Sequence, residues 1–418
     1  MRFLYTLAWI ISLPFAFLYL LWRSRRQPEY RRHWDERLGH GHNFRGRPLI
    51  WVHAVSVGET RAAAPLIHAL RERYRNHTIL LTHTTPTGRA TGRQLYGDLV
   101  RQSYLPYDLP WLVKRFLERA RPQLGIILET EIWPNLFAVC RRRDLPLYLV
   151  NARLSAQSAQ GYARYSALVR PTLAALWGVA AQTDDDAGRL GELGAEDVVV
   201  TGNLKYDVAL PPDTSTKSRV LRDLFGERFV FLAASTREGE EALILDVLHR
   251  IDLPDLLLAL VPRHPQRFDE VARLLESRGL SYVRRSSGQH ASIRTQVFLG
   301  DSMGELAAYY SAADLAFVGG SLLPLGGQNL IEAAAVGCPV LIGPHTFNFT
   351  EVANLAVSRG AAVRVADANE LAEMVNTLSA APDRLARMSA AGADFTAENR
   401  GATARVLAMI AKPTPGAG

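Results

Sequence analysis

Charged residues that could bind or transform a ligand follow the predicted strands of this sequence, and Glu332 is the most informative of them. It lies in the segment Gly326–Ala335, Gly-Gly-Gln-Asn-Leu-Ile-Glu-Ala-Ala-Ala, which predicts a glycine-loosened loop, a helix start and a carboxylate one turn further on. Backbone N–H groups at a helix start bind phosphate, and the carboxylate could accept both hydroxyls of a ribose. The pattern favours a nucleotide site over the alternative, a surface helix whose Glu faces solvent.

A second carboxylate, Glu59, follows the first predicted strand. Ser56 and Glu59 have the spacing of a capping box, in which the Glu only bonds the Ser backbone N–H. The functional interpretation makes Glu59 a general base that deprotonates an acceptor hydroxyl. A helix start stabilises the carboxylate and so weakens it as a base. The residues themselves leave these two interpretations equally open.

Two further loops of the first half carry charges at strand ends. Glu129 and Glu131 directly follow the predicted strand 124–128, and they would point in opposite directions if that strand continued. At most one of them is then expected to face a ligand, and hydrogen bonding within the loop is the alternative role. Lys205, after the predicted strand 198–201, could meet a carboxylate or a phosphate, although a surface lysine is the ordinary alternative.

The second half repeats this pattern at the ends of three more predicted strands. Each loop offers a cation, a hydroxyl or a glycine before a helix, and we expect them to form a pocket for an anionic nucleotide together with the Gly326 segment. The loops are Ser235-Thr-Arg237, Val261-Pro-Arg-His-Pro265 and Gly300-Asp-Ser-Met-Gly-Glu305. A metal site is not expected. Asp184-Asp-Asp186 matches an Asp-x-Asp pattern, but Thr183 before it predicts a capped helix start rich in acids.

The elements that must position these residues alternate between strand and helix over most of the 418 residues, which predicts mostly parallel sheets in two doubly wound α/β domains. Ligands of such folds bind beyond the carboxyl ends of the strands, so we expect the site in a cleft between the domains. The predicted boundaries run along the chain as anchor 1–22, basic segment 23–47, first domain 48–210, linker 211–218, second domain 219–411 and disordered tail 412–418.

The N-terminus predicts membrane attachment. Phe3–Trp22 has no charged residue and is long enough, at about 1.5 Å per residue, to cross a bilayer as a helix. The arginines that follow place the globular part in the cytoplasm, and they would attract anionic lipid headgroups. Pro14 leaves open a kinked or interfacial helix instead of a span. No aromatic platform supports nucleic acid as the partner of this basic stretch, and Cys140 and Cys338 are expected to be buried thiols.

Several of these segments together resemble the Kdo transferases, which are membrane-anchored enzymes that move 3-deoxy-D-manno-octulosonic acid (Kdo) from CMP-Kdo to a lipid A precursor, lipid IVA. The resemblance runs from the apolar N-terminus over most of the chain. Its motifs are His53-Ala-Val-Ser-Val-Gly-Glu, Glu129-Thr-Glu-Ile-Trp-Pro-Asn, Asn151-Ala-Arg-Leu-Ser, Gly202-Asn-Leu-Lys-Tyr-Asp, Val261-Pro-Arg-His-Pro and Gly343-Pro-His-Thr-Phe-Asn-Phe.

The resemblance implies a two-domain glycosyltransferase fold of the GT-B type at the cytoplasmic face of the inner membrane, with no cofactor and no metal. It makes Glu59 the proton acceptor and gives Glu129 and Lys205 the role of stabilising the transition state. It also implies a CMP-binding set, namely Pro262, Arg263, Met303, Gly304, Glu305, Asn329, Leu330, Ile331 and Glu332. The rival hypotheses are a lipid-linked transferase of the same fold that uses a UDP sugar and an inert membrane-tethered protein that binds nucleotide sugars.

Overall fold

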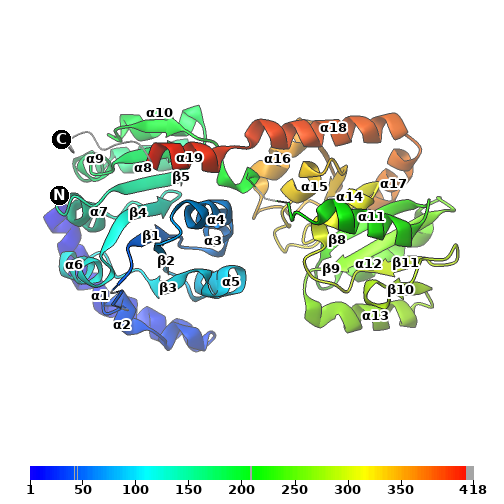
Figure 1. Ribbon diagram of the computed structural model, residues 1–418, viewed down its shortest axis with the longest axis horizontal. Helices are drawn as coiled ribbons and strands as arrows, with labels where there is room; N and C mark the ends of the chain where they lie inside the picture. Colours follow the sequence, from blue (N-terminus) through cyan, green and yellow to red (C-terminus); the bar gives the residue numbers. More distant parts are fainter. Residues whose placement is uncertain (42, 45, 208–209, 411–418) are drawn as a thin grey trace. The chain divides into compact units, whose positions relative to one another are not determined.

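The computed structural model describes residues 1–41, 43–44, 46–207 and 210–410. The chain divides into two compact units, and each is described by itself (Figure 1). Unit 1 comprises Met1–Asp207 and Arg400–Gly418, and unit 2 comprises Val208–Asn399. Each unit contains one seven-stranded sheet whose strand pairs are all parallel. The predicted fold class of two doubly wound α/β domains is confirmed.

The sheet of unit 1 has the strand order β3-β2-β1-β4-β5-β6-β7. The chain starts in the middle of the sheet, builds one half outward to β3, and then returns to lay β4 on the other side of β1. The strands are β1 (Leu49–His53), β2 (Thr78–His83), β3 (Arg101–Tyr104), β4 (Pro122–Leu128), β5 (Leu147–Ala152), β6 (Gly178–Ala181) and β7 (Val198–Val200).

Helices cover both faces of this sheet (Figure 1), which is why strands such as β1 are buried at every position and not only at alternate ones. Leu49 and Trp51 enter one core cluster, while Ile50 and Val52 enter the other. The helices of unit 1 are α1 (Arg2–Arg23), α2 (Trp34–Arg37), α3 (Val57–Ala62), α4 (Ala64–Arg73), α5 (Pro86–Tyr96), α6 (Pro110–Ala120), α7 (Pro134–Arg141), α8 (Ala156–Ala163), α9 (Ser166–Leu173), α10 (Asp184–Glu192) and α19 (Ala402–Ile410), with 3-10 turns η1 (Pro28–Arg31), η2 (Gly97–Leu99) and η3 (Leu204–Tyr206).

The sheet of unit 2 has the order β10-β11-β9-β8-β12-β13-β14, again with its first strand in the interior. Its strands are β8 (Phe229–Thr236), β9 (Leu256–Pro262), β10 (Tyr282–Arg284), β11 (Val297–Leu299), β12 (Leu315–Val318), β13 (Val340–Ile342) and β14 (Ala362–Arg364). Its helices are α11 (Thr214–Phe225), α12 (Glu240–Val247), α13 (Phe268–Ser277), α14 (Leu306–Ala312), α15 (Ile331–Ala335), α16 (Thr350–Ser358), α17 (Ala368–Ser379) and α18 (Pro382–Asn399), with 3-10 turns η4 (Leu248–Arg250), η5 (Pro265–Arg267) and η6 (Arg285–Ser287).

The structure corrects the predicted boundary of the second domain at its carboxyl end. We expected residues 219–411 to belong together, but α19 returns to unit 1. Val406 and Ile410 lie in a core cluster of unit 1, and the carboxylate of Asp207 accepts hydrogen bonds from the backbone N–H groups of Gly401 and Thr403 at the start of the helix. An amphipathic pattern shows that a helix needs an apolar partner but does not identify that partner.

Two other predicted boundaries also differ from the structure. Helix α11 starts at Thr214, inside the predicted linker 211–218. The basic segment 23–47 is partly folded onto unit 1, because the Glu36 carboxylate, only 2% exposed, forms an ion pair of 2.5 Å with Arg89 and accepts the backbone N–H of Tyr104. The predicted tail 412–418 lies outside the described residues.

Candidate active site

Glu59 lies at the carboxyl end of β1, in the first turn of α3. Ser56 is the N-cap residue of this helix, and its hydroxyl accepts the N–H of Glu59. The carboxylate accepts hydrogen bonds from the backbone N–H of Val55 at 2.7 Å and from the Ser56 hydroxyl at 2.8 Å. The structure therefore contains a variant of the predicted capping box, in which the Glu side chain bonds the N–H of Val55 and not that of Ser56.

Burial outweighs these hydrogen bonds in setting the basicity of Glu59. The side chain is 7% exposed, and loss of hydration raises the pKa of its carboxyl group. The hydrogen bonds from Val55 and Ser56 lower the pKa, and the nearby charge of Glu129 raises it further, so that the net change is upward. The start of α3 therefore opposes the basicity of Glu59, as the sequence predicts, but burial reverses the net effect.

Glu129, which directly follows β4, and Lys205, which lies in η3 after β7, approach each other. Their Oε1 and Nζ atoms are 3.9 Å apart, and both side chains are roughly a quarter exposed. Glu129 has a φ of 57°, in the left-handed region, so the chain turns sharply as β4 ends. Lys205 thus meets a carboxylate, as one of the two sequence interpretations expected.

Glu131, in the same loop, is also close to the other carboxylates. Burial and the charges of Glu59 and Glu129 raise the pKa of the Glu131 carboxyl group to about 7. We expected strand alternation to turn one of the two loop carboxylates away, but β4 ends at Leu128 and the alternation ends with it. Three carboxylates that influence one another therefore gather at one edge of the sheet of unit 1.

The sheet order explains why these residues meet. Strands β1 and β4 are neighbours, but the chain leaves them toward opposite halves of the sheet. Such a switch point leaves a crevice at the carboxyl ends of its two central strands, where ligands of doubly wound folds bind. Glu59 follows one of these strands and Glu129 follows the other, so unit 1 presents its carboxylates at the place where this topology accepts a ligand.

A buried amide network, which the sequence did not reveal, holds the loop that carries Lys205. The Asn151 side chain accepts the N–H of Leu204, and the Asn203 side chain accepts the N–H of Lys205, both at 3.0 Å. The Gln182 side chain in turn accepts a hydrogen bond from the Asn203 amide at 2.9 Å. The network fixes the backbone from which Lys205 reaches Glu129.

In unit 2, Arg263 and Glu332 both lie close enough to Tyr310 for their charges to affect its hydroxyl. Burial and the charge of Glu332 raise the pKa of Tyr310, whereas Arg263 lowers it. Arg263 follows β9, and its N–H donates to the carbonyl of Thr236 at the end of β8. The structure therefore brings together two residues of the expected CMP-binding set that are 69 positions apart in the sequence.

The glycine-rich loop before Glu332 has the backbone that the sequence predicts. Gly326 and Gly327 have φ values of 92° and 75°, and a Cβ atom on Gly326 would come within 2.1 Å of the Asn348 amide nitrogen. Helix α15 spans only five residues, with Glu332 in its first turn and not one turn further on. Leu330 and Ile331 are at most 1% exposed, so their side chains belong to the core and only their backbone groups can face a ligand.

Three further residues of the expected donor site, Met303, Gly304 and Glu305, occupy the loop after β11, whereas Pro262 is the last residue of β9 and Asn329 directly precedes the N-cap residue of α15. The Glu305 carboxylate accepts hydrogen bonds from Arg285 at 3.0 Å and from the Ser302 hydroxyl at 2.5 Å. Gly304 has a φ of 77°, and the Met303 side chain is 58% exposed. Glu305 therefore fixes the loop, while Met303 is free to contact a ligand.

Glu240, which the sequence did not single out, organises the switch point of unit 2. Its carboxylate is fully buried and accepts the backbone N–H groups of Gly320, Ser321 and Leu322 after β12 and of Arg237 after β8. A buried carboxylate is stable only with such a set of donors. Glu240 therefore joins the two loops that leave the neighbouring strands β8 and β12.

The acidic run at residues 184–186 has a capping role. The Thr183 hydroxyl accepts the N–H of Asp186, and the Asp186 carboxylate accepts the N–H of Leu154. Within the described part of the chain, no group of three or more His, Cys, Asp or Glu side chains is arranged to hold a metal ion. The assignment of this run as a capped helix start is confirmed.

Comparisons with known proteins point to one family. Residues 32–208 match the family model described as 3-deoxy-D-manno-octulosonic-acid transferase (kdotransferase), and residues 280–395 match glycosyl transferases group 1. A relative from Bordetella pertussis with the name 3-deoxy-D-manno-octulosonic acid transferase is 45% identical, with 97% of this chain and 98% of the relative aligned. A relative of the same name from Haemophilus influenzae is 40% identical, with 98% of each chain aligned.

A solved structure supports the fold. The UDP-GlcNAc 2-epimerase from Neisseria meningitidis, bound to UDP-GlcNAc, matches with a TM-score of 0.56 at 16% identity, covering 88% of this chain and 100% of that one. At this identity the likeness concerns the fold alone. It agrees with the GT-B type expected from the sequence.

Proposed function

The chain belongs to the 3-deoxy-D-manno-octulosonic acid (Kdo) transferases and is a glycosyltransferase, and from this premise we propose that it moves Kdo from CMP-Kdo to the lipid A precursor lipid IVA. The observation that carries the proposal is the position of Glu59. This buried carboxylate lies at the switch point of unit 1 and its pKa is raised. Glu129 follows the neighbouring strand β4, and the Nζ atom of Lys205 lies 3.9 Å from the Glu129 carboxylate.

In the proposed reaction, Glu59 accepts the proton of a sugar hydroxyl of the acceptor. The hydroxyl oxygen forms a bond to the anomeric carbon of Kdo as the bond from that carbon to the phosphate oxygen of CMP breaks, and CMP leaves with the electron pair. A single displacement of this kind inverts the anomeric centre. The raised pKa of Glu59 brings its basicity closer to neutral pH, where a general base is most effective.

Glu129 and Lys205 are proposed to stabilise the transition state. The Lys205 ammonium can compensate negative charge that develops as the bond to CMP breaks, and the contact of 3.9 Å with Glu129 holds it in place. Removal of either partner is expected to lower kcat more than it changes the affinity for CMP. That pattern would distinguish stabilisation of the transition state from simple substrate binding.

Unit 2 is proposed to bind the CMP portion of the donor. Arg263 supplies a cation, Glu332 supplies a carboxylate for the ribose hydroxyls, and the glycine-rich loop at Gly326 supplies backbone donors. The remaining contacts come from Pro262 at the end of β9 and from the loop residues Met303, Gly304 and Asn329. The proposal includes no divalent metal, so the activity should survive excess EDTA.

Helix α1 is proposed to hold the enzyme at the cytoplasmic face of the inner membrane, where the amphiphilic acceptor resides. It is the one helix of the described chain that is long and apolar enough to cross a membrane, a criterion of length and composition alone. The arginines that follow it would meet anionic headgroups and the phosphates of the acceptor.

The proposal is tested by mass spectrometry of a tetraacylated, bisphosphorylated lipid A precursor after incubation with detergent-purified protein and CMP-Kdo generated in place. Gain of one or more Kdo units is expected, and the mass also gives the number of additions. No gain, under conditions in which a known Kdo transferase succeeds, would contradict the proposal. Protection of unit 2 from proteolysis by CMP and not by UDP tests the donor separately, and protection by UDP alone would favour a UDP-sugar donor.

A further inference from the structure

One face of α1 is bound to the globular part of unit 1 by hydrogen bonds between side chains. The Tyr5 hydroxyl donates to the carboxylate of Asp108 at 3.0 Å. The Thr6 hydroxyl and the side-chain amide of Asn135 lie 3.0 Å apart, with the amide as donor. Tyr5 and Thr6 are the two polar uncharged side chains in the first third of α1, and both have partners in the globular part of unit 1.

Aromatic contacts continue the same face toward the end of the helix. Trp9 packs on Tyr107 with ring centroids 5.7 Å apart, and Phe17 packs between Tyr107 and Trp34 at 5.8 Å and 5.0 Å. Leu20 is only 5% exposed. The contacts recur at a spacing of three to four residues or its multiples, so one continuous stripe of α1 lies against unit 1 for about 22 Å. Figure 1 shows α1 beside α7.

The docking surface is built into the fold of unit 1. Asp108, which is 1% exposed, also accepts the backbone N–H groups of Asn135 at 3.0 Å and Leu136 at 2.7 Å at the start of α7. Burial raises the pKa of Asp108 to about 6, and the three donors oppose this change. The carboxylate that holds Tyr5 therefore also fixes α7, so α1 is attached to a rigid part of the unit.

The opposite face of α1 is apolar and uncovered. Its large side chains are between 40% and 78% exposed, and the helix has no charged residue between Arg2 and Arg23. An exposed apolar surface of this extent marks an interaction site. The residues of this face are Phe3, Leu4, Leu7, Ile10, Ile11, Phe15, Leu18, Leu21 and Trp22.

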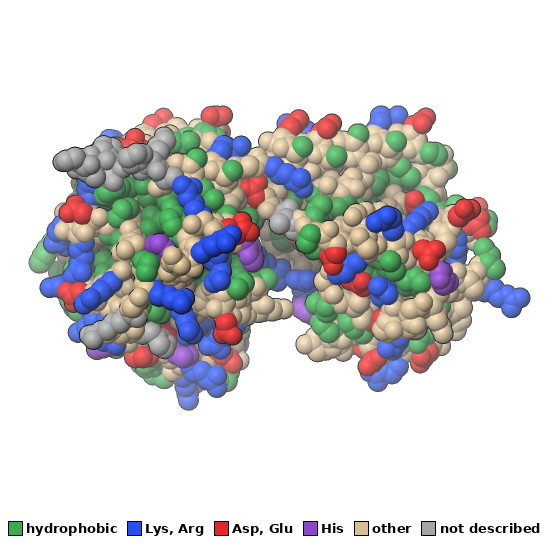
Figure 2. Space-filling view, viewed as in Figure 1, with side chains coloured by type: hydrophobic (Ala, Val, Ile, Leu, Met, Phe, Trp, Pro, Cys, Tyr) green, Lys and Arg blue, Asp and Glu red, His purple; other side chains and the backbone are tan. Residues whose placement is uncertain are grey.

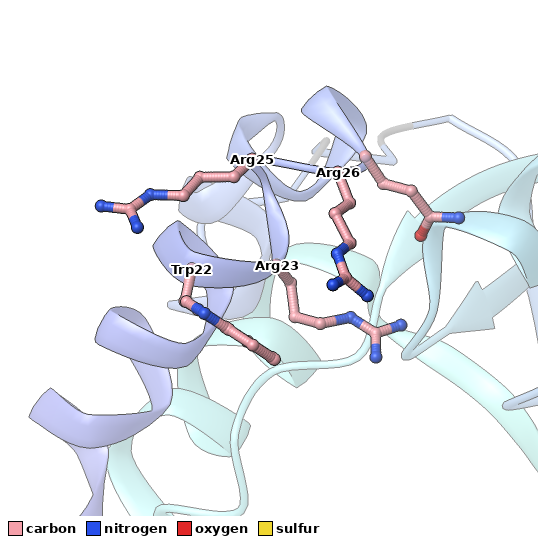
Figure 3. Close-up of a pocket in the computed structure, with 5 residues that line it drawn as sticks. Trp22, Arg23, Arg25 and Arg26 are labelled. Carbon is pink, nitrogen blue, oxygen red and sulfur yellow. The ribbon is translucent and has the colours of Figure 1, made fainter.

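Arginine side chains surround the carboxyl end of this apolar face. Trp22, Arg23, Arg25, Arg26 and Gln27 line a hollow of about 380 Å³, in which Arg23 and Arg26 extend to one side while Arg25 extends away from them (Figure 3). Lys and Arg side chains also recur along the left and lower edges of unit 1, with hydrophobic side chains between them (Figure 2). Cationic and apolar side chains side by side are suited to a lipid surface with anionic headgroups.

From these contacts we infer that α1 does not cross the bilayer but lies in the plane of one leaflet, with Tyr5, Trp9 and Phe17 on unit 1 and the opposite face among the acyl chains. A spanning α1 would have to leave its stripe of contacts, and the Tyr5 hydroxyl would lose Asp108 as its partner, while the Thr6 hydroxyl would lose Asn135 and keep only its bond to the Arg2 carbonyl within the helix. It would also carry Arg2 and the N-terminal ammonium to the far side of the membrane. The in-plane helix keeps both charged ends at one surface.

This inference rests on the proposed membrane attachment, and the depth of three positions on the exposed face tests it. Leu4, Ile11 and Leu18 are spaced by seven residues, so they lie on one side of the helix and differ in height by about 10 Å each if the helix stands upright. Each is replaced in turn by Cys in the full chain, labelled with the fluorophore NBD and bound to vesicles of phosphatidylcholine and phosphatidylglycerol. Quenching by lipids that carry nitroxides at two acyl-chain depths then reports the depth of each label.

Equal depths at the three positions are expected from the in-plane helix. A helix that spans the bilayer would instead place position 11 near the centre of the hydrocarbon and the other two positions nearer to the opposite surfaces. A label at Ile11→Cys that lies deeper than those at both Leu4→Cys and Leu18→Cys would therefore overturn the inference. The native thiols do not interfere, because Cys140 and Cys338 are buried.

Two controls separate the possible failures. Labelled Ala404→Cys, an exposed site on α19, should show no quenching by either lipid. Failure of all the labelled proteins to bind the vesicles would overturn the in-plane helix together with the proposed membrane attachment. Kdo transfer measured in detergent reports independently on the proposed reaction, so a failed reaction and a failed membrane contact give different results.

Discussion

Among single residues, Glu59 shows most clearly how the environment decides whether a side chain can act as a base. Burial raises its pKa, the hydrogen bonds from Val55 and Ser56 lower it, and the charge of Glu129 raises it again. The capping role and the proposed catalytic role are compatible, because a carboxylate has about four acceptor positions and the hydrogen bonds from Val55 and Ser56 do not use them all. The same side chain can therefore complete the start of α3 and receive a proton.

Replacing Glu59 by Gln should keep the fold and the binding of CMP but lower kcat by about 10²- to 10⁴-fold, the usual contribution of a general base. Kinetics with the lipid acceptor and calorimetry with CMP measure the two effects. Glu72→Gln, at an exposed position of α4, is the matched control and should change neither. Turnover close to that of the unaltered enzyme would exclude Glu59 as the base.

Glu131 gives a prediction about pH. Burial and the charges of Glu59 and Glu129 raise its pKa to about 7. Between its usual pKa near 4.5 and this value, the folded state binds more protons than the unfolded state, so the contribution of Glu131 to stability is lost as the pH rises through this window.

Glu131→Gln should therefore stabilise the protein at pH 8, by about 2 kcal/mol at most, and have little effect at pH 4.5. Thermal unfolding at both pH values measures the difference. The substitution also removes a negative charge near Glu59, so the acidic limb of the pH–rate profile should move to lower pH. An equal effect on the unfolding temperature at both pH values would show that the Glu131 charge is not the cause.

At the level of helices and strands, one buried side chain joins two strand ends of unit 2. The Glu240 carboxylate accepts four backbone N–H groups, three of them from the loop after β12 and one from the loop after β8. These loops lie at the switch point of the sheet. The shape of the proposed donor-binding side of unit 2 thus depends on Glu240, whose carboxylate is already bonded to backbone groups of the protein.

Glu240→Gln should loosen both loops. The four backbone N–H groups now donate hydrogen bonds to the carboxylate, and the NH₂ group of Gln cannot accept such bonds. We expect the free energy of unfolding to fall by about 2–4 kcal/mol and the Kd for CMP to rise. The kcat at saturating donor should change less than the Kd. Thermal unfolding and calorimetry measure these quantities. Glu238→Gln, two residues away and exposed, is the control. Unchanged CMP affinity in a folded Glu240→Gln protein would contradict the positioning role.

Over the whole molecule, the chain crosses from unit 1 to unit 2 and then returns. The long α18 ends unit 2, and α19 supplies Val406 and Ile410 to a core cluster of unit 1. The end of the sequence therefore stabilises the unit that its beginning builds.

Val406→Ala should lower the stability of unit 1 by about 2 kcal/mol, because it leaves a cavity in that core, and should leave CMP binding by unit 2 unchanged. Calorimetric unfolding with and without CMP separates the two transitions if CMP stabilises only one of them. Ala408→Ser, at an exposed position of the same helix, is the control. A loss confined to the transition that CMP stabilises would place α19 with unit 2 instead.

Features that depend on local pattern and on motif chemistry could be predicted from the sequence. Alternating apolar runs and amphipathic stretches predicted two parallel α/β sheets, and the glycines at 326 and 327 predicted a loop before a helix, because these properties depend on neighbouring residues. Motifs at strand ends also indicated the family and the residues Glu59, Glu129 and Lys205, whose catalytic roles stay predictions.

Which distant segments become neighbours could be read only from the folded chain. The structure added Glu131 to the carboxylate group, assigned α19 to unit 1, placed Glu240 between two loops and laid one face of α1 against Asp108. The physical reason is the same in each case. A periodic pattern shows that a face must be buried and a charge must be paired, whereas the partner is chosen by sheet order and packing over the whole chain.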